Sequence, residues 1–168
     1  TTVLHCRLIS LKMPCIHGTM AFQFNKNKEA TYSIKNILFG KELTYEIPSS
    51  NLNRNGKAVG EIIGGNLSIL YALSGSVDDL KTKNKILFIE DLDEQLYHID
   101  RMMLQLKRSG KLKDLKGLVV GGMSEMKDNT IPFGKTAEEI ILDAVKEYTY
   151  PVCFHFPAGH IEKNMAMY

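Results

Sequence analysis

A carboxylate that follows an apolar segment is the first feature of the sequence that could support chemistry. Residues 85–90 read Lys-Ile-Leu-Phe-Ile-Glu, and Asp91, Asp93 and Glu94 come directly after them. Open α/β sheets place their sites at the carboxyl ends of buried strands. The three following acids could equally cap the next helix and interact with its positive dipole end. Glu90 continues the buried strand, and a buried charge needs a partner, so a functional and a structural role are both open for it.

A histidine in a turn is the second such feature. Residues 154–160 read Phe-His-Phe-Pro-Ala-Gly-His, an apolar strand that passes into Pro and Gly. This pattern predicts that His160 lies in a turn where its side chain can face a cleft. Such a histidine can act as a general base near neutral pH, although an ordinary surface role is also open. Pairing with a buried Glu90 that fixed the ring tautomer would favour the catalytic role.

Two further positions could bind an anion. Gly64 and Gly65 precede Asn66 at a predicted helix start, where free backbone N–H groups could receive a substrate carboxylate. Helix capping by Asn66 explains the pattern equally well. Arg101, which follows Asp100, could bind a carboxylate or form an ion pair on the helix surface.

Metal and serine chemistry find less support in the residues. Cys15 with His17 and Cys153 with His155 form two Cys-x-His pairs, which together make a formal zinc ligand set. Structural zinc sites usually have wider ligand spacings, so we expect no metal site. None of the serines lies in a Gly-x-Ser-x-Gly elbow. The chain therefore offers an acid and a base without a nucleophile.

Alternating strands and helices must position these residues. The pattern predicts an α/β organisation with one sheet. The expected elements are a helix at 67–73, a strand at 85–90, a helix near 94–108, a strand at 117–121, a helix near 136–148 and a strand at 151–156.

The first 63 residues show weaker patterns. We expect a helix at 2–12 that ends before Pro14, a strand and turn at 15–18, and a connector with a helix within 25–40. Alternating residues at 43–47 and 58–63 flank several turn formers, which predicts a β-hairpin with a long loop.

Composition limits the class of protein. The 168 residues are 44% hydrophobic and 24% charged, which is typical of one globular domain, and the net charge of +2 gives no basic stripe for nucleic acid. The apolar runs are far shorter than the roughly 20 residues of a membrane helix. Three cysteines at wide spacing favour a reducing compartment, so we expect the cytoplasm. The start at Thr1 has no initiator Met or signal pattern, and we expect a cut piece of a longer protein.

Five motifs in order resemble one family. They are Gly60-Glu-Ile-Ile-Gly-Gly-Asn-Leu67, Ile86-Leu-Phe-Ile-Glu-Asp91, Tyr97-His-Ile-Asp-Arg101 with Gln105-Leu106, Gly117-Leu-Val-Val-Gly121, and Phe156-Pro-Ala-Gly-His160. Their order and spacing resemble those of the murein tetrapeptide LD-carboxypeptidases and the related microcin C immunity peptidases.

The resemblance implies a serine peptidase with a Ser-Glu-His triad. Glu90 matches the Glu of the triad and His160 its His, while the Ser would lie just upstream of Thr1. It also implies that residues 1–24 are the end of an N-terminal nucleophile domain and 25–40 a connector. Residues 41–168 would form a swivelling β/β/α-type C-terminal domain that is truncated at its end.

The implied reaction is hydrolysis of the terminal D-alanine of a murein tetrapeptide during cell-wall recycling, without a cofactor. The substrate carboxylate would lie near Asn66. Without the Ser, the isolated chain should be inactive. The implied partners are the peptide substrate and the missing N-terminal domain, and a homodimer stays open.

Two alternatives to the peptidase remain. The chain could be a non-catalytic domain that binds a peptide or a protein partner, with Glu90 and His160 as a structural pair. It could also be a zinc-bound module built on the two Cys-x-His pairs.

Overall fold

The computed structural model describes all 168 residues as an α/β fold. The helices are α1 (Thr2–Ser10), the 3-10 turn η1 (Ala21–Gln23), α2 (Lys28–Leu38), α3 (Leu67–Ala72), α4 (Leu96–Arg108) and α5 (Ala137–Ala144). The strands are β1 (Ile62–Asn66), β2 (Ile86–Leu92), β3 (Gly117–Ser124) and β4 (Val152–Cys153). The predicted α/β organisation from residue 62 onward is confirmed.

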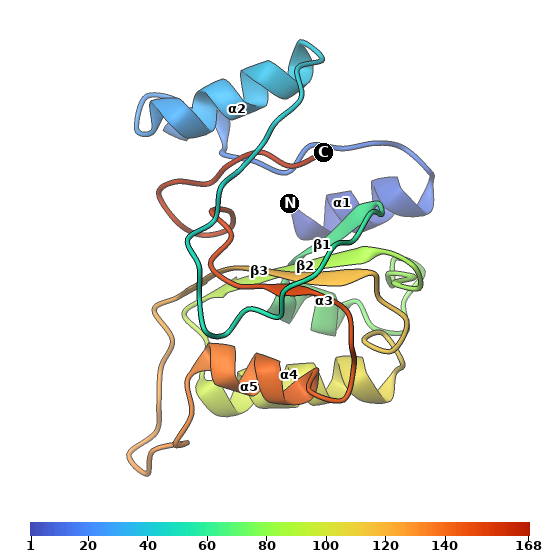
Figure 1. Cartoon of the computed structure of the whole chain (residues 1–168), viewed down its shortest axis with the longest axis vertical. Coiled ribbons are helices and arrows are strands. Elements are labelled where there is room, and N and C mark those ends of the chain that lie inside the picture. Colours follow the sequence, from blue (N-terminus) through green and yellow to red (C-terminus); the bar gives the residue numbers. More distant parts are fainter.

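The four strands form one parallel sheet in the order β1-β2-β3-β4. Helices α4 and α5 lie on one side of this sheet, whereas α1, α2 and the last residues lie toward the other (Figure 1). Because every strand is parallel, all carboxyl ends meet at one edge, and the residues that follow the strands gather there.

The main apolar core lies between the sheet and its helices. The inward residues of β2 and β3 are buried, as are Ile99, Met102, Met103 and Leu106 on α4. The spacing of these α4 residues produces one apolar stripe along the helix, while the strands are nearly continuous apolar runs. No helix in the structure is both long and apolar enough to cross a membrane.

The predicted hairpin is wrong. Residues 43–47 form no strand, and only the end of 58–63 enters the sheet, as β1 parallel to β2. The connecting segment is instead tied to β4 by Arg54, whose backbone forms an antiparallel bridge with Val152. The Arg54 guanidinium donates to the carbonyl of Val145 at 3.2 Å, at the end of α5. A cation stabilises the negative end of a helix, so a long-range contact overrides the local turn pattern.

Three other expected elements are shorter than predicted. The first helix ends at Ser10 instead of residue 12, because Lys12 has a φ of 57° that a helix does not allow. The strand expected at 151–156 is limited to Val152–Cys153, and His155 has a φ of 59°. The helix expected at 136–148 begins after Thr136, where a capping box fixes its start, and it ends at Ala144.

His17 packs against a second, small apolar cluster that contains Phe88, Ala158 and Met167. The strand predicted at 15–18 is reduced to one antiparallel bridge between His17 and Met167. The His17 ring packs edge-on against Phe88 at 5.2 Å between centroids, and its Nε2 is buried without a hydrogen-bond partner. Burial lowers the pKa of His17 from 6.5 to about 4.

This burial predicts a pH-dependent loss of stability. Because the folded pKa of His17 is below its unfolded value, the unfolded chain binds the extra proton between pH 6.5 and about 4. The buried neutral His17 therefore costs no stability above pH 6.5. On acidification below that pH, the free energy of unfolding falls by up to about 3 kcal/mol. His17→Phe keeps the contact with Phe88 and removes the titration. Urea unfolding at pH 7 and pH 4.5 should show a smaller loss for this variant, and equal losses would contradict the prediction.

Candidate active site

Glu90 lies at an irregular point of β2. The register between β2 and β3 pairs Ile89 with Val120 and then Asp91 with Met123, so β3 carries one extra residue opposite Glu90. Glu90 is only 2% exposed, on the face of the strand that also carries Phe88. The bulge leaves room at the carboxyl edge for another segment to approach this carboxylate.

The segment that approaches is the loop after β4. The Gly122 amide donates to the carbonyl of Ala158 at 3.0 Å, which fixes the loop on the bulge. A side chain at Gly121 would place its Cβ 2.4 Å from the Ala158 oxygen. The glycines of β3 therefore allow the loop to pack directly on the backbone of the strand.

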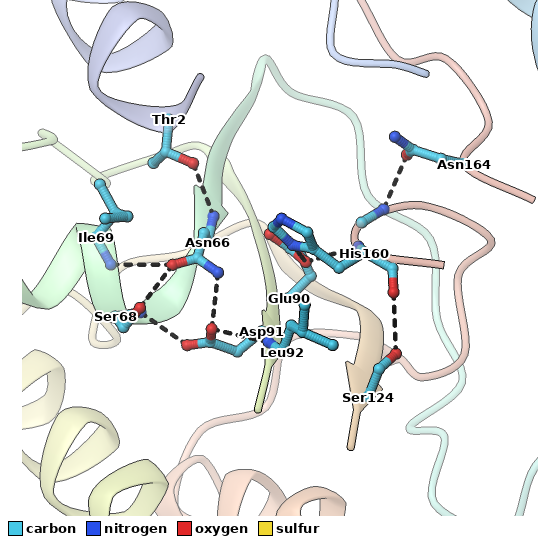
Figure 2. A network of polar contacts seen from close by, with 11 residues as sticks. Thr2, Asn66, Ser68, Ile69, Glu90, Asp91, Leu92, Ser124, His160 and Asn164 are labelled. Atoms are coloured by element: carbon cyan, nitrogen blue, oxygen red, sulfur yellow. Dashed lines mark hydrogen bonds and ion pairs between the residues drawn. The ribbon is translucent and has the colours of Figure 1, made fainter. Parts of the chain in front are cut away.

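Glu90 and His160 form a close pair (Figure 2). Glu90 Oε2 accepts from His160 Nδ1 at 2.8 Å and from the His160 amide at 2.9 Å. The pair is asymmetric, because the Glu90 side chain is 3% exposed and that of His160 is 52% exposed. A carboxylate that accepts from Nδ1 leaves Nε2 as the free, basic nitrogen of the neutral ring. The arrangement can therefore take a proton at Nε2 and stabilise the resulting imidazolium.

Two more hydrogen bonds hold the backbone of the Gly159–His160 turn. Ser124 Oγ, at the end of β3, donates to the His160 carbonyl at 3.2 Å. The Gly159 amide donates to Asn164 Oδ1 at 2.9 Å. The turn that carries the exposed ring is thus fixed on both sides of His160 (Figure 2).

Asn66 makes its contacts within the chain. Its Oδ1 accepts from the Ile69 amide at 3.1 Å and caps α3, and its Nδ2 donates to Asp91 Oδ1 at 2.7 Å. The amide of Ser68 donates to Asp91 Oδ2 at 2.9 Å. The amides of Asn66, Ser68 and Ile69, which we expected to be free for a substrate, therefore already have partners, and a substrate-binding role for Asn66 stays a prediction.

The acids after Glu90 do not cap α4 as expected. Asp91 points to the start of α3, while Asp93 pairs with Lys127 at 2.5 Å and Glu94 with His98 at 2.6 Å. The N-cap of α4 is Gln95, which makes no side-chain capping bond. The sequence could have shown that Asp91 and Glu90 lie in different environments, because neighbouring residues of a strand face opposite sides of the sheet.

The other two candidates receive no support from the geometry. The Arg101 guanidinium lies over the Tyr97 ring at 5.4 Å, without the predicted ion pair. The structure contains no group of three or more His, Cys, Asp or Glu side chains placed to hold a metal ion. Burial raises the pKa of the thiols of Cys15 and Cys153, which disfavours the thiolates that zinc requires.

A match to a known family gives the class of this α/β fold. Residues 59–168 match the family described as the LD-carboxypeptidase C-terminal domain, and the chain belongs to this family. The predicted resemblance is confirmed at this level.

Two relatives are described as murein peptidases. The chain is 36% identical over 141 residues to a probable murein peptide carboxypeptidase of Bacillus subtilis (strain 168), covering 80% of the chain and 43% of that protein. It is 25% identical over 167 residues to a murein tetrapeptide carboxypeptidase of Pseudomonas aeruginosa, covering 92% and 53%. The chain therefore spans about half the length of these relatives.

Solved structures agree on the fold. The crystal structure of a muramoyltetrapeptide carboxypeptidase from Oxalobacter formigenes has a TM-score of 0.88 at 26% identity and covers 99% of this chain and 58% of that one. The microcin C7 self immunity protein MccF has a TM-score of 0.82 at 19% identity, over 99% of this chain and 59% of that one, and this likeness concerns the fold alone.

Gly159 provides a test of the Glu90–His160 geometry. Its φ is +109°, and an added Cβ would lie 2.7 Å from Glu90 Oε2. Gly159→Ala should displace the carboxylate and destabilise the fold by about 2 kcal/mol or more, through overpacking and backbone strain. The ¹⁵N shifts of the neutral His160 ring should then show loss of the Nδ1–H tautomer.

A matched control separates strain from displacement. Gly134 has a φ of +84° with nothing within 4 Å of an added Cβ. Gly134→Ala should cost only about 1 kcal/mol and leave the His160 ring unchanged. The same ring signals in both variants would contradict the geometry described for the site.

Proposed function

We propose that this chain is the acid–base half of a serine LD-carboxypeptidase. The supporting observation is the pair itself, in which a buried Glu90 accepts two hydrogen bonds from a half-exposed His160. The pair lies at the carboxyl edge of a parallel sheet, where α/β folds hold their sites. Its two members match the base and the acid that serve the nucleophile of a Ser-His-acid triad.

The proposed reaction is acyl transfer from a murein tetrapeptide. The Nε2 atom of His160 takes the proton of a serine hydroxyl as the oxygen attacks the scissile carbonyl, and it then gives that proton to the amine of the departing D-alanine. Water repeats the cycle on the acyl-enzyme and releases the shortened peptide. Glu90 keeps the ring in the Nδ1–H tautomer and stabilises its charged form. The names of the Bacillus subtilis and Pseudomonas aeruginosa relatives support murein peptides as the substrate class.

The serine belongs to the part of the relatives that this chain does not cover. We infer that residues 1–24 are the end of that nucleophile domain, that 25–40 connect it, and that 41–168 carry Glu90 and His160. The isolated chain is then inactive, since losing the nucleophile of a triad costs on the order of 10⁶ in turnover. All three cysteines are free, which supports the cytoplasm as the compartment.

A chimera tests this function. Residues 1–168 are joined behind the segment of the Bacillus subtilis relative that precedes its matched region, and release of D-alanine from murein tetrapeptide is measured. The chimera should be active and the chain alone inactive. His160→Ala in the chimera should lower turnover by on the order of 10⁴-fold or more without unfolding it, because the ring lies at the surface. Wild-type turnover in that variant would refute the role, and a folded but inactive chimera would favour the binding domain.

Glu90→Gln tests the acid separately. The amide keeps the shape of the carboxylate but can present a donor to Nδ1 and favour the wrong ring tautomer. We expect turnover of the chimera to fall on the order of 10⁴-fold, as for the comparable change in other triads. Steady-state kinetics and circular dichroism check activity and folding together. Unchanged turnover would show that Glu90 has only a structural role.

A further inference from the structure

A hydrogen-bonded connection runs from α1 to β2 through Asn66 (Figure 2). The Asn66 amide donates to Thr2 Oγ1 at 3.0 Å, and its side chain donates to Asp91 Oδ1 at 2.7 Å. The second Asp91 oxygen accepts from the amide of Ser68 on α3. The ends of β1 and β2 and the start of α3 therefore meet around the Asp91 carboxylate, and the first turn of α1 joins them through the Asn66 amide.

Asp91 is a buried charge without a cation. It is 1% exposed, and its three donors are the Leu92 amide, the Ser68 amide and Asn66 Nδ2. Burial raises its pKa, while these hydrogen bonds act in the opposite direction, and Glu94 is the nearby acid that adds to the rise. A buried carboxylate with three donors also holds those donors in place. Losing any of the three hydrogen bonds would leave buried charge unsatisfied, which costs free energy.

The connection to α1 is also sterically tight. Thr2 is 7% exposed, and a Cβ added at Gly65 would lie 2.6 Å from its Oγ1. The first turn of α1 thus rests directly on the backbone of β1. In the proposed enzyme the nucleophilic serine lies just before this turn in the sequence. Its position in space therefore depends on where Thr2 is held.

The sheet holds Glu90 regularly only on the β1 side, where its register partner is Asn66. Regular pairing with β3 is interrupted between Ile89 and Asp91, and it resumes at Asp91 and Leu92. On the β3 side, Asp91 is therefore the first residue after the bulge that can restrain the direction of Glu90. Its restraint comes from the opposite face of the strand, through Asn66 and Ser68.

We infer that Asp91 is a positioning residue, which holds the first turn of α1 and the Glu90–His160 pair at a fixed separation. The inference rests on the proposed function, because the need for that separation comes from a serine upstream of α1. Asp91 acts through its contacts with Asn66 and Ser68 and through its chain neighbour Glu90.

Asp91→Asn in the 168-residue chain is the first test. One of the two oxygens becomes an NH₂ group that faces a donor, either Asn66 Nδ2 or the Ser68 amide, so the connection should break. The Glu90 carboxylate should then no longer point at His160 Nδ1. The ¹⁵N shifts of the neutral His160 ring should show loss of the Nδ1–H tautomer. The control Asp93→Asn makes the same chemical change in an exposed ion pair with Lys127 and should leave the ring unchanged.

An exchange of the two side chains tests the same contact by rescue. In Asn66→Asp combined with Asp91→Asn, residue 66 still accepts from the Ile69 amide, and the new amide at 91 donates to it. The Ser68 amide keeps an acceptor, whereas the Leu92 amide, which donates to the same Asp91 Oδ1, then faces the new NH₂ group. The exchange should therefore restore part of the Nδ1–H tautomer that Asp91→Asn loses. If the single variant does not fold, the exchange variant decides: a folded exchange variant that lacks the tautomer overturns the inference.

Turnover in the chimera gives an independent reading. Asp91→Asn should lower kcat by about 10–100-fold, the usual range for residues that orient a reacting group, with KM nearly unchanged. A folded Asp91→Asn variant with the wild-type tautomer and kcat would overturn the positioning role. An inactive wild-type chimera would instead defeat the proposed function, and the ring signals of the 168-residue chain would still decide the role of Asp91.

Discussion

The hydrogen bond between Glu90 and His160 is the contact around which the carboxyl edge of the sheet is built. Glu90 is buried at the end of β2, and a carboxylate in that place is unstable without donors. Its donors come from a loop 70 residues later, so β3 must let that loop approach. The extra residue in β3 and the missing side chain at Gly121 provide the approach, and Gly159 avoids a collision with the carboxylate.

Local patterns in the sequence predicted the alternating strands and helices of the α/β fold well. Strands β2 and β3 are continuous apolar runs, and α4 has an apolar stripe, because each is buried against the same core. The hairpin failed because its turn residues are equally compatible with an irregular segment. The contact of Arg54 with the end of α5 spans 91 residues, and no local pattern encodes such a choice.

The candidate site was predictable in part for the same reason. Glu90 ends an apolar run and His160 follows Pro and Gly, so each could be singled out from its own neighbourhood. Their convergence depends on strand order, which no local pattern gives, and only the resemblance, which places both in one triad, implied it. Capping of the next helix, one of the roles open for Asp91, is wrong, since this carboxylate is close in sequence to α4 but close in space to α3. The glycines before Asn66 suggested anion binding, whereas Gly65 gives room to Thr2.

Glu90 and Asp91 show how one strand can use two buried carboxylates differently. Neighbouring residues face opposite sides of the sheet, so the two charges have separate environments. Asp91 is balanced by amide donors, which do not titrate, and it can therefore only hold structure. Glu90 is balanced by an imidazole, whose other nitrogen is open to solvent and can exchange a proton. The capacity for acid–base chemistry thus follows from the kind of donor that meets the carboxylate, and only the residue that faces the loop after β4 meets a titratable one.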